Sequence, residues 1–133
     1  MDTLKLWHQI IDSADSRSLD DLLADNVVFH SPVVHKPQPG KALTRRYLGA
    51  ALQVLLKPGK FRYLREIKGQ QDAMLEFVAE VDGIEINGVD IIHWDATGRI
   101  CDFKVMVRPL KAILLLQQKM AAMLEQTKDQ TQA

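Results

Sequence analysis

Four strand-like segments joined by short turns constrain the fold of this chain more than any other feature. They occupy residues 61–69, 73–81, 85–95 and 99–107. The second and third segments are joined by an Asp-Gly pair, which is a strong signal of a tight hairpin. Because connections this short leave no room for crossover helices, the four segments are predicted to form an antiparallel meander.

Helical patterns surround this meander. Apolar residues recur at helical spacing in residues 4–14, 19–23 and 43–55, and again in a last helix over 110–126. A short β-branched and aromatic run at 27–31 is predicted to be a further strand. Helices therefore cluster early and strands late, which predicts a single α+β domain over residues 1–126, in which a curved sheet wraps around the early helices and leaves a cavity. The polar tail, residues 127–133, is predicted to be disordered.

Charge and cysteine content exclude several classes of protein. The 133 residues contain 17 basic and 17 acidic side chains, so the formal net charge of the chain is zero. A neutral chain has no general affinity for nucleic acid or for a membrane surface. The absence of net charge mildly favours self-association. The one cysteine, Cys101, cannot form an internal disulfide, and the pattern of the N-terminal residues predicts no signal peptide. A cytoplasmic location is therefore predicted.

Two stretches of the sequence resemble a known family. Residues 19–32 read LDDLLADNVVFHSP, and residues 88–100 read GVDIIHWDATGRI. They are similar to the short helix, first strand and proline bulge, and to the paired strands, of the nuclear transport factor 2-like superfamily, in particular its SnoaL-like and ketosteroid-isomerase-like proteins. The resemblance implies a cone-shaped α+β barrel with an added C-terminal helix, and homodimers formed through the outer face of the sheet. It leaves function open, because isomerases, cyclases, dehydratases, epoxide hydrolases and non-catalytic binding domains share this fold.

Asp90 is the first candidate for a catalytic residue. Strand alternation places Asp90 on the same face as Ile92 and Trp94, so an inward-facing Trp94 would carry the carboxylate into the core. Burial among apolar side chains would raise the pKa of this carboxyl group, which could then act as an acid or as a hydrogen-bond donor. By resemblance, Asp90 occupies the position of the protonated oxyanion-hole aspartate of ketosteroid isomerase. The alternative is an aspartate that faces solvent or is paired with a basic side chain.

The remaining isomerase residues are replaced in this chain. By resemblance, the carboxylate base aligns with Ser31 and the oxyanion tyrosine aligns approximately with Trp7. Ser31 is too weak an acid to serve as such a base, and Trp7 offers a single N–H donor. His30 is the second catalytic candidate, because imidazole titrates near neutral pH. Strand alternation nevertheless separates His30 from Ser31 unless the bulge re-aims one of them.

A ligand pocket is expected at the wide end of the sheet. The predicted lining consists of aromatic and apolar side chains with one serine, namely Trp7, Ser31, Tyr47, Phe77, Ile92, Trp94, Phe103, Val105 and Val107. No metal site or organic cofactor is predicted, because the histidines lack the spacing of metal ligands.

Two hypotheses of function remain open at this point. The first is a pocket that binds a small apolar molecule and isomerises, dehydrates or hydrolyses it by acid–base chemistry. The second is a non-catalytic module that holds a partner through the sheet or the last helix, which could equally be a lid or part of the core. Pocket volume discriminates between them, because a ligand site needs several hundred Å³.

Overall fold

The computed structural model describes the backbone of residues 2–132 and the side chains of residues 2–126. Its elements follow the order α1 (Thr3–Ser13), η1 (Ser16–Ser18), α2 (Leu19–Leu22), β1 (Leu23–His30), β2 (Gln38–Pro39), α3 (Lys41–Leu56), β3 (Arg62–Lys68), β4 (Asp72–Val81), β5 (Ile84–Trp94), β6 (Ile100–Arg108) and α4 (Leu110–Gln132). The α+β class, the curved sheet and the added C-terminal helix are confirmed.

The sheet has the strand order β2-β1-β6-β5-β4-β3. Strands β3 to β6 form the predicted antiparallel meander, and β1 joins it by parallel pairing with β6. The edges are formed by β2 and β3, so the sheet curves without closing into a barrel. Register shifts in the β1–β6, β3–β4 and β5–β6 pairs mark bulges, which bend a sheet.

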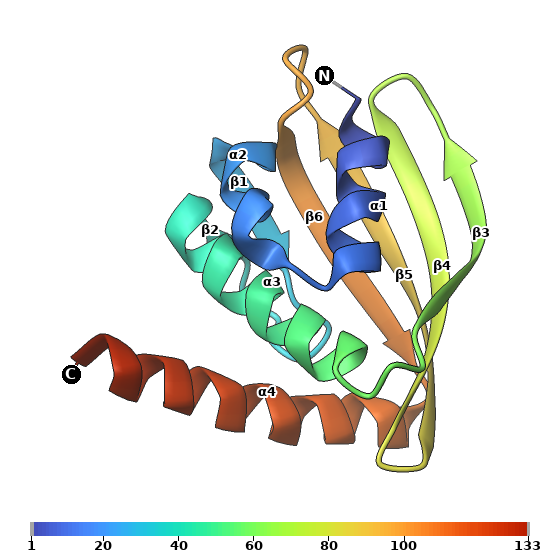
Figure 1. Cartoon of the computed structure of the whole chain (residues 1–133), viewed down its shortest axis with the longest axis vertical. Helices are drawn as coiled ribbons and strands as arrows, with labels where there is room; N and C mark the ends of the chain where they lie inside the picture. Colours follow the sequence, from blue (N-terminus) through green and yellow to red (C-terminus); the bar gives the residue numbers. More distant parts are fainter. Residues whose placement is uncertain (1, 133) are drawn as a thin grey trace.

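The helices cover one face of this sheet (Figure 1). Helices α1, α2 and α3 lie against the concave face, and α4 crosses one end of it. Trp7 of α1, Leu48 of α3 and Phe103 of β6 are almost completely buried where these layers meet. Because α4 buries Ala112, Leu116 and Met120, its first half belongs to the core.

Three elements differ from the expectations. Strand β1 begins at Leu23, earlier than predicted, because the chain passes directly from the one-turn helix α2 into the sheet. The proline-rich loop contains the two-residue strand β2, whose apolar pattern is too short to be recognised. Helix α4 continues to Gln132 instead of ending near Gln126. The predicted disorder of residues 127–133 stays a prediction, since the side chains of that segment and residue 133 lie outside the described part.

A glycine on β5 fixes how closely two strands and an aromatic ring approach one another. A side chain at Gly88 would collide with the ring of Phe77 and with the backbone oxygen of Met106. Phe77 in turn stacks on Phe61, with ring centroids 5.1 Å apart. This packing holds Phe77 of β4, together with Phe61 just before β3, over the middle of β5, two residues before Asp90.

Candidate functional site

Asp90 lies inside the domain on the concave face of β5. Gly88, Asp90, Ile92 and Trp94 alternate inward along the strand, and Asp90 is only 6% exposed. The side chain therefore takes the orientation expected from strand alternation.

A chain of hydrogen bonds holds the buried carboxylate. The hydroxyl of Tyr63 donates to Oδ2 of Asp90 at 2.5 Å, and Nε1 of Trp7 donates to the Tyr63 oxygen at 2.9 Å. The three residues come from β5, β3 and α1, so the chain of bonds connects the sheet to the first helix. Tyr63 is oriented by edge-on contacts with Phe61 and Phe77.

Burial dominates the electrostatics of this pair. Loss of hydration raises the pKa of Asp90 to about 7, and the hydrogen bond from Tyr63 acts in the opposite direction. Burial also raises the pKa of Tyr63 well above its ordinary value, and the neighbouring Asp90 charge adds to this effect. Near neutral pH the Asp90 carboxyl group is therefore divided between its acid and carboxylate forms, while Tyr63 remains a hydrogen-bond donor.

Asp90 forms part of the wall of a small enclosed cavity. The cavity has a volume of about 20 Å³, which is enough for one water molecule. Within the described part of the chain, Oδ1 of Asp90 makes no hydrogen bond, so this oxygen can serve a bound group. The other lining residues are Trp7, Pro32, Leu48, Ala51, Leu52, Leu55, Phe61, Phe103, Val105, Leu116 and Met120.

Only part of the predicted lining meets at this cavity. Trp7, Phe103 and Val105 line it together with Asp90. Phe77 and Ile92 are fully buried elsewhere in the core, and Trp94 lies at the far end of β5 beside a different surface hollow. The other three predicted lining residues, Ser31, Tyr47 and Val107, are half-buried and lie outside this cavity.

His30 lies on the opposite face of the sheet from Asp90. Its neighbour Phe29 faces the core and is fully buried, so alternation along β1 turns His30 to the opposite face of the sheet. There, Nε2 of His30 lies 3.0 Å from Oδ1 of Asp102. The register shift of β1 lies between Leu23 and Val28, and pairing with β6 is regular at Phe29 and His30, so no bulge re-aims this side chain. Ser31 does not replace it in the cavity, because its hydroxyl accepts a hydrogen bond from the backbone N–H of Val33.

Tyr63 is the site residue that sequence reasoning missed. The residue pattern of its strand gives no reason to pair it with Asp90. The pairing depends on the strand register, which sets Tyr63 opposite Phe77 and Phe77 opposite Gly88. A usable signal was the alternation that places this phenol on the same face of the strand as Phe61.

Metal clusters and membrane-spanning helices are both absent from the residues that the structure describes. No group of three or more His, Cys, Asp or Glu side chains there could hold a metal ion. In the same part of the chain, no helix combines the length and the apolar character needed to span a bilayer.

Comparison with known proteins identifies the family. The SnoaL-like domain model matches residues 4–103, whereas no curated protein matches the chain. A steroid delta-isomerase from Pseudomonas aeruginosa is 36% identical, with a TM-score of 0.89 over 96% of this chain and 92% of its own. An uncharacterized protein of cystatin-like fold from Silicibacter pomeroyi is 32% identical, with a TM-score of 0.82 over 90% and 83% of the two chains.

A more distant structure shares the fold alone. It is an NTF2-like protein of unknown function from Mesorhizobium loti, 18% identical, with a TM-score of 0.70 over 80% of this chain and 88% of its own. Together with the buried carboxylate inside a curved, helix-covered sheet, these matches lead to one conclusion. The chain belongs to the SnoaL-like domain family within the NTF2-like superfamily.

Proposed function

We propose that this chain binds a small, largely apolar molecule whose oxygen atom hydrogen-bonds to Asp90, and that Asp90 acts on it as an acid. The observation that carries this proposal is the chain of hydrogen bonds from Trp7 through Tyr63 to a buried carboxyl group at the wall of an apolar cavity. Strongly perturbed carboxyl groups in apolar surroundings are concentrated at functional sites. The similar structure from Pseudomonas aeruginosa is that of a steroid delta-isomerase, which supports the same chemistry.

The chemistry follows from the two forms of the carboxyl group. Protonated Asp90 would donate a hydrogen bond from Oδ1 to a carbonyl or ether oxygen of the ligand, while Oδ2 keeps its bond from Tyr63. Donation to an oxygen that gains negative charge is stronger in a dry site than in water. Isomerisation of an unsaturated ketone, dehydration and epoxide opening all develop such a charge. Asp90 is the only carboxyl or imidazole group among the described residues that line the cavity.

By the criterion of pocket volume, the small cavity favours the non-catalytic interaction module, so a ligand site at Asp90 carries a condition. A volume of about 20 Å³ cannot hold an organic ligand, so occupation requires lining side chains to move. Leu116 and Met120 of α4 close one side, which gives this helix the position of a lid.

Ligand-induced thermal shifts test the proposal. Wild type and Asp90→Asn would be screened against apolar ketones, phenols and epoxides, including a Δ5-3-ketosteroid whose isomerisation is followed by its ultraviolet absorbance. We expect at least one oxygen-bearing ligand to stabilise the wild type, and less so the variant. If no compound stabilises either protein, the proposal fails.

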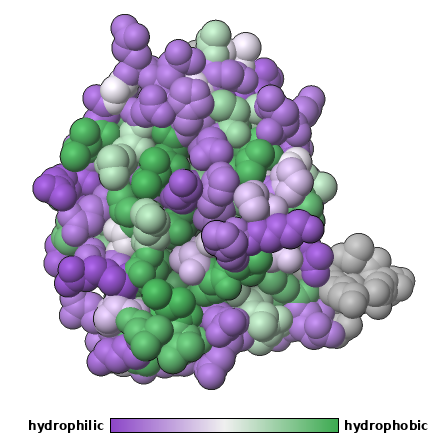
Figure 2. Space-filling model, turned by 180° about the vertical axis from the view of Figure 1, so that it is seen from behind, coloured by the Kyte–Doolittle hydropathy of each residue, from purple (hydrophilic) through white to green (hydrophobic). Residues whose placement is uncertain are grey.

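The outer face of the sheet supports a second proposal, a homodimer. Ile67, Met74 and Met106 on this face are each more than 40% exposed. Figure 2 shows apolar patches bordered by hydrophilic side chains on the side of the molecule away from the helices. The face also carries both signs of charge, with Arg65 lying 3.7 Å from Glu76. We propose a second copy of the chain as the partner at this face. In a symmetric dimer, the basic and acidic side chains of this face would pair with those of the same face on the other copy.

Sedimentation analysis tests the homodimer. We expect wild type to sediment as a dimer and Met106→Asp as a monomer. Leu114→Asp, at a position on α4 that is 50% exposed, is the matched control and should remain dimeric. A monomeric wild type at all concentrations would contradict this proposal.

We also propose a cytoplasmic location. The unpaired thiol of Cys101 suits a reducing compartment. Recovery of the protein in the envelope or secreted fraction after cell fractionation would argue against it.

A further inference from the structure

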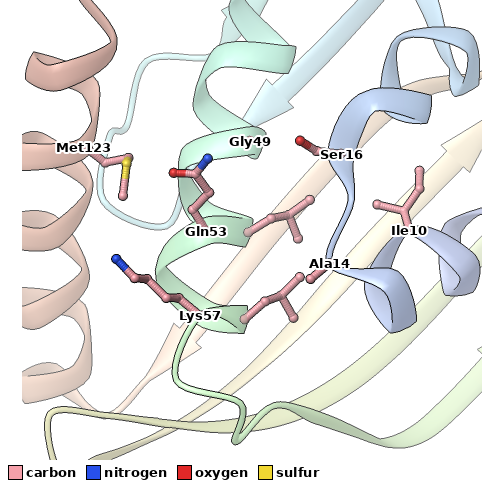
Figure 3. A pocket seen from close by; sticks show the side chains of 9 residues that line it. Ile10, Ala14, Ser16, Gly49, Gln53, Lys57 and Met123 are labelled. Atoms are coloured by element: carbon pink, nitrogen blue, oxygen red, sulfur yellow. The ribbon is translucent and has the colours of Figure 1, made fainter.

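A groove much larger than the Asp90 cavity crosses the outer side of α3 (Figure 3). It has a volume of about 380 Å³ and lies between the end of α1, the middle of α3 and the helix α4. Ile10, Leu52 and Met123 supply apolar surface, and Gln53 and Lys57 supply polar groups. This volume falls within the range of small-molecule sites, whereas the Asp90 cavity holds only one water molecule.

The groove and the Asp90 cavity share a wall. Leu52 of α3 lines both spaces. On α1, Trp7 lines the cavity and Ile10 lines the groove, and on α4 the same is true of Met120 and Met123. Residues three apart lie on one side of a helix, so the same sides of α1 and α4 continue from one space into the other.

Gly49 is an independent sign that the groove is kept open. It lies in the interior of α3 and lines the groove, and a Cβ atom built on it would meet no atom within 4 Å. Glycine destabilises a helix interior relative to alanine. Neither the backbone conformation nor the packing requires a glycine at this position. The structural effect of Gly49 is therefore the space that it leaves in the groove.

The outer end of the groove offers a cation. Lys57 directly follows the last residue of α3, one turn after Gln53, and Figure 3 shows the Lys57 side chain extending toward α4 and Met123. Within the described part of the chain, the Lys57 ammonium group has no ion pair. A carboxylate at this end would provide its counter-charge.

We infer that the groove and the cavity form one elongated ligand site, divided in this structure by the side chain of Leu52. The ligand class that fits is an amphipathic acid: a hydroxyl or carbonyl oxygen at Asp90, an apolar body across Leu52, and a carboxylate at Lys57. The Asp90 end of this inference rests on the proposed function, and the groove end stands on its own geometry.

Calorimetric titration with 6-hydroxy-2-naphthoate tests the inference, with 2-naphthoate and 2-naphthol as probes that lack one polar end. Gly49→Leu fills the groove, and Ala42→Leu adds the same side chain at an exposed position of α3 outside the groove. We expect Gly49→Leu to weaken binding of the hydroxy acid at least about tenfold, and Ala42→Leu to leave it within about twofold. Asp90→Asn should weaken the hydroxy acid but not 2-naphthoate.

The outcomes separate this inference from the proposed function. If Gly49→Leu binds the hydroxy acid as tightly as wild type while Asp90→Asn binds it more weakly, the groove is excluded and the proposed function stands. If Gly49→Leu weakens binding and Asp90→Asn does not, the ligand occupies the groove alone, and the single elongated site is overturned. Absence of binding to wild type at about millimolar concentration overturns it as well, whereas the thermal-shift screen tests the Asp90 cavity separately.

Discussion

Replacement of Asp90 by asparagine should change how the stability of the domain depends on pH. Burial raises the pKa of Asp90 from 3.8 to about 7 in the folded protein. Between these values the folded state holds a proton that the unfolded state has released, so the free energy of unfolding falls as pH rises. A shift of about three units corresponds to about 4 kcal/mol at 1.36 kcal/mol per unit. This contribution is present in full below about pH 4 and is lost by about pH 8.

Asparagine isolates this contribution because it keeps the shape and the acceptor oxygen of the side chain without its charge. The amide oxygen can still accept the hydrogen bond from Tyr63, so the loss is confined to the titrating proton. The difference in unfolding free energy between Asp90→Asn and wild type should therefore move in favour of the variant by about 4 kcal/mol between pH 4 and pH 8. Histidines and surface carboxylates contribute equally to both proteins and cancel in the difference.

Urea denaturation of both proteins at several pH values between 4 and 8 gives the measurement. Glu85→Gln is the matched control, because Glu85 lies on the same strand with its side chain exposed. The difference in unfolding free energy between Glu85→Gln and wild type should stay constant over this pH range within about 0.5 kcal/mol. A similarly flat difference for Asp90→Asn would refute the argument, since it would mean that the Asp90 carboxyl group titrates alike in the folded and unfolded states.

Four further substitutions probe the site and its surroundings. Tyr63→Phe removes the donor to Asp90 and should destabilise the domain by about 1–3 kcal/mol. Because the Tyr63 hydrogen bond lowers the pKa of Asp90, an NMR titration of the Asp90 carboxyl group in this variant should show a higher pKa than in wild type. Gly88→Ala should destabilise the domain by about 1–3 kcal/mol through overpacking. Gly49→Ala, whose new methyl group meets no atom within 4 Å, should stabilise it by about 0.5–1 kcal/mol. Urea denaturation should therefore show changes in unfolding free energy of opposite sign for the two variants. His30→Ala should leave ligand-induced thermal shifts unchanged, and loss of those shifts would contradict its placement on the outer face.

The sequence was sufficient for the fold because its signals are local and redundant. Short turns specify the meander, and apolar periodicity specifies the helices. The inward direction of Asp90 followed from alternation on one strand, and the alternation of β1 already separated His30 from Ser31. The element that was not predicted depends on long-range pairing. Strand β2 is two residues long and is formed only because Gln38 and Pro39 pair with β1.

The interior of the site could not be predicted for a related reason. The partnership of Tyr63 with Asp90 depends on the register across β3, β4 and β5, and a sequence pattern gives faces but not registers. The size of the cavity depends on how far Leu116 and Met120 of α4 reach over the sheet. That distance is set by how α4 packs on the rest of the domain, and apolar periodicity gives no information about it.

The energetic cost of Asp90 is itself an argument for function. A domain of this size has a net stability of about 5–15 kcal/mol, so a group that costs about 4 kcal/mol at neutral pH removes a substantial part of it. Asparagine would accept the same hydrogen bond from Tyr63 without this cost, so structure alone gives no reason for a carboxyl group here. What asparagine cannot do is release and recover a proton near neutral pH at the wall of an apolar space. The feature that destabilises the domain is thus the one that acid–base chemistry requires.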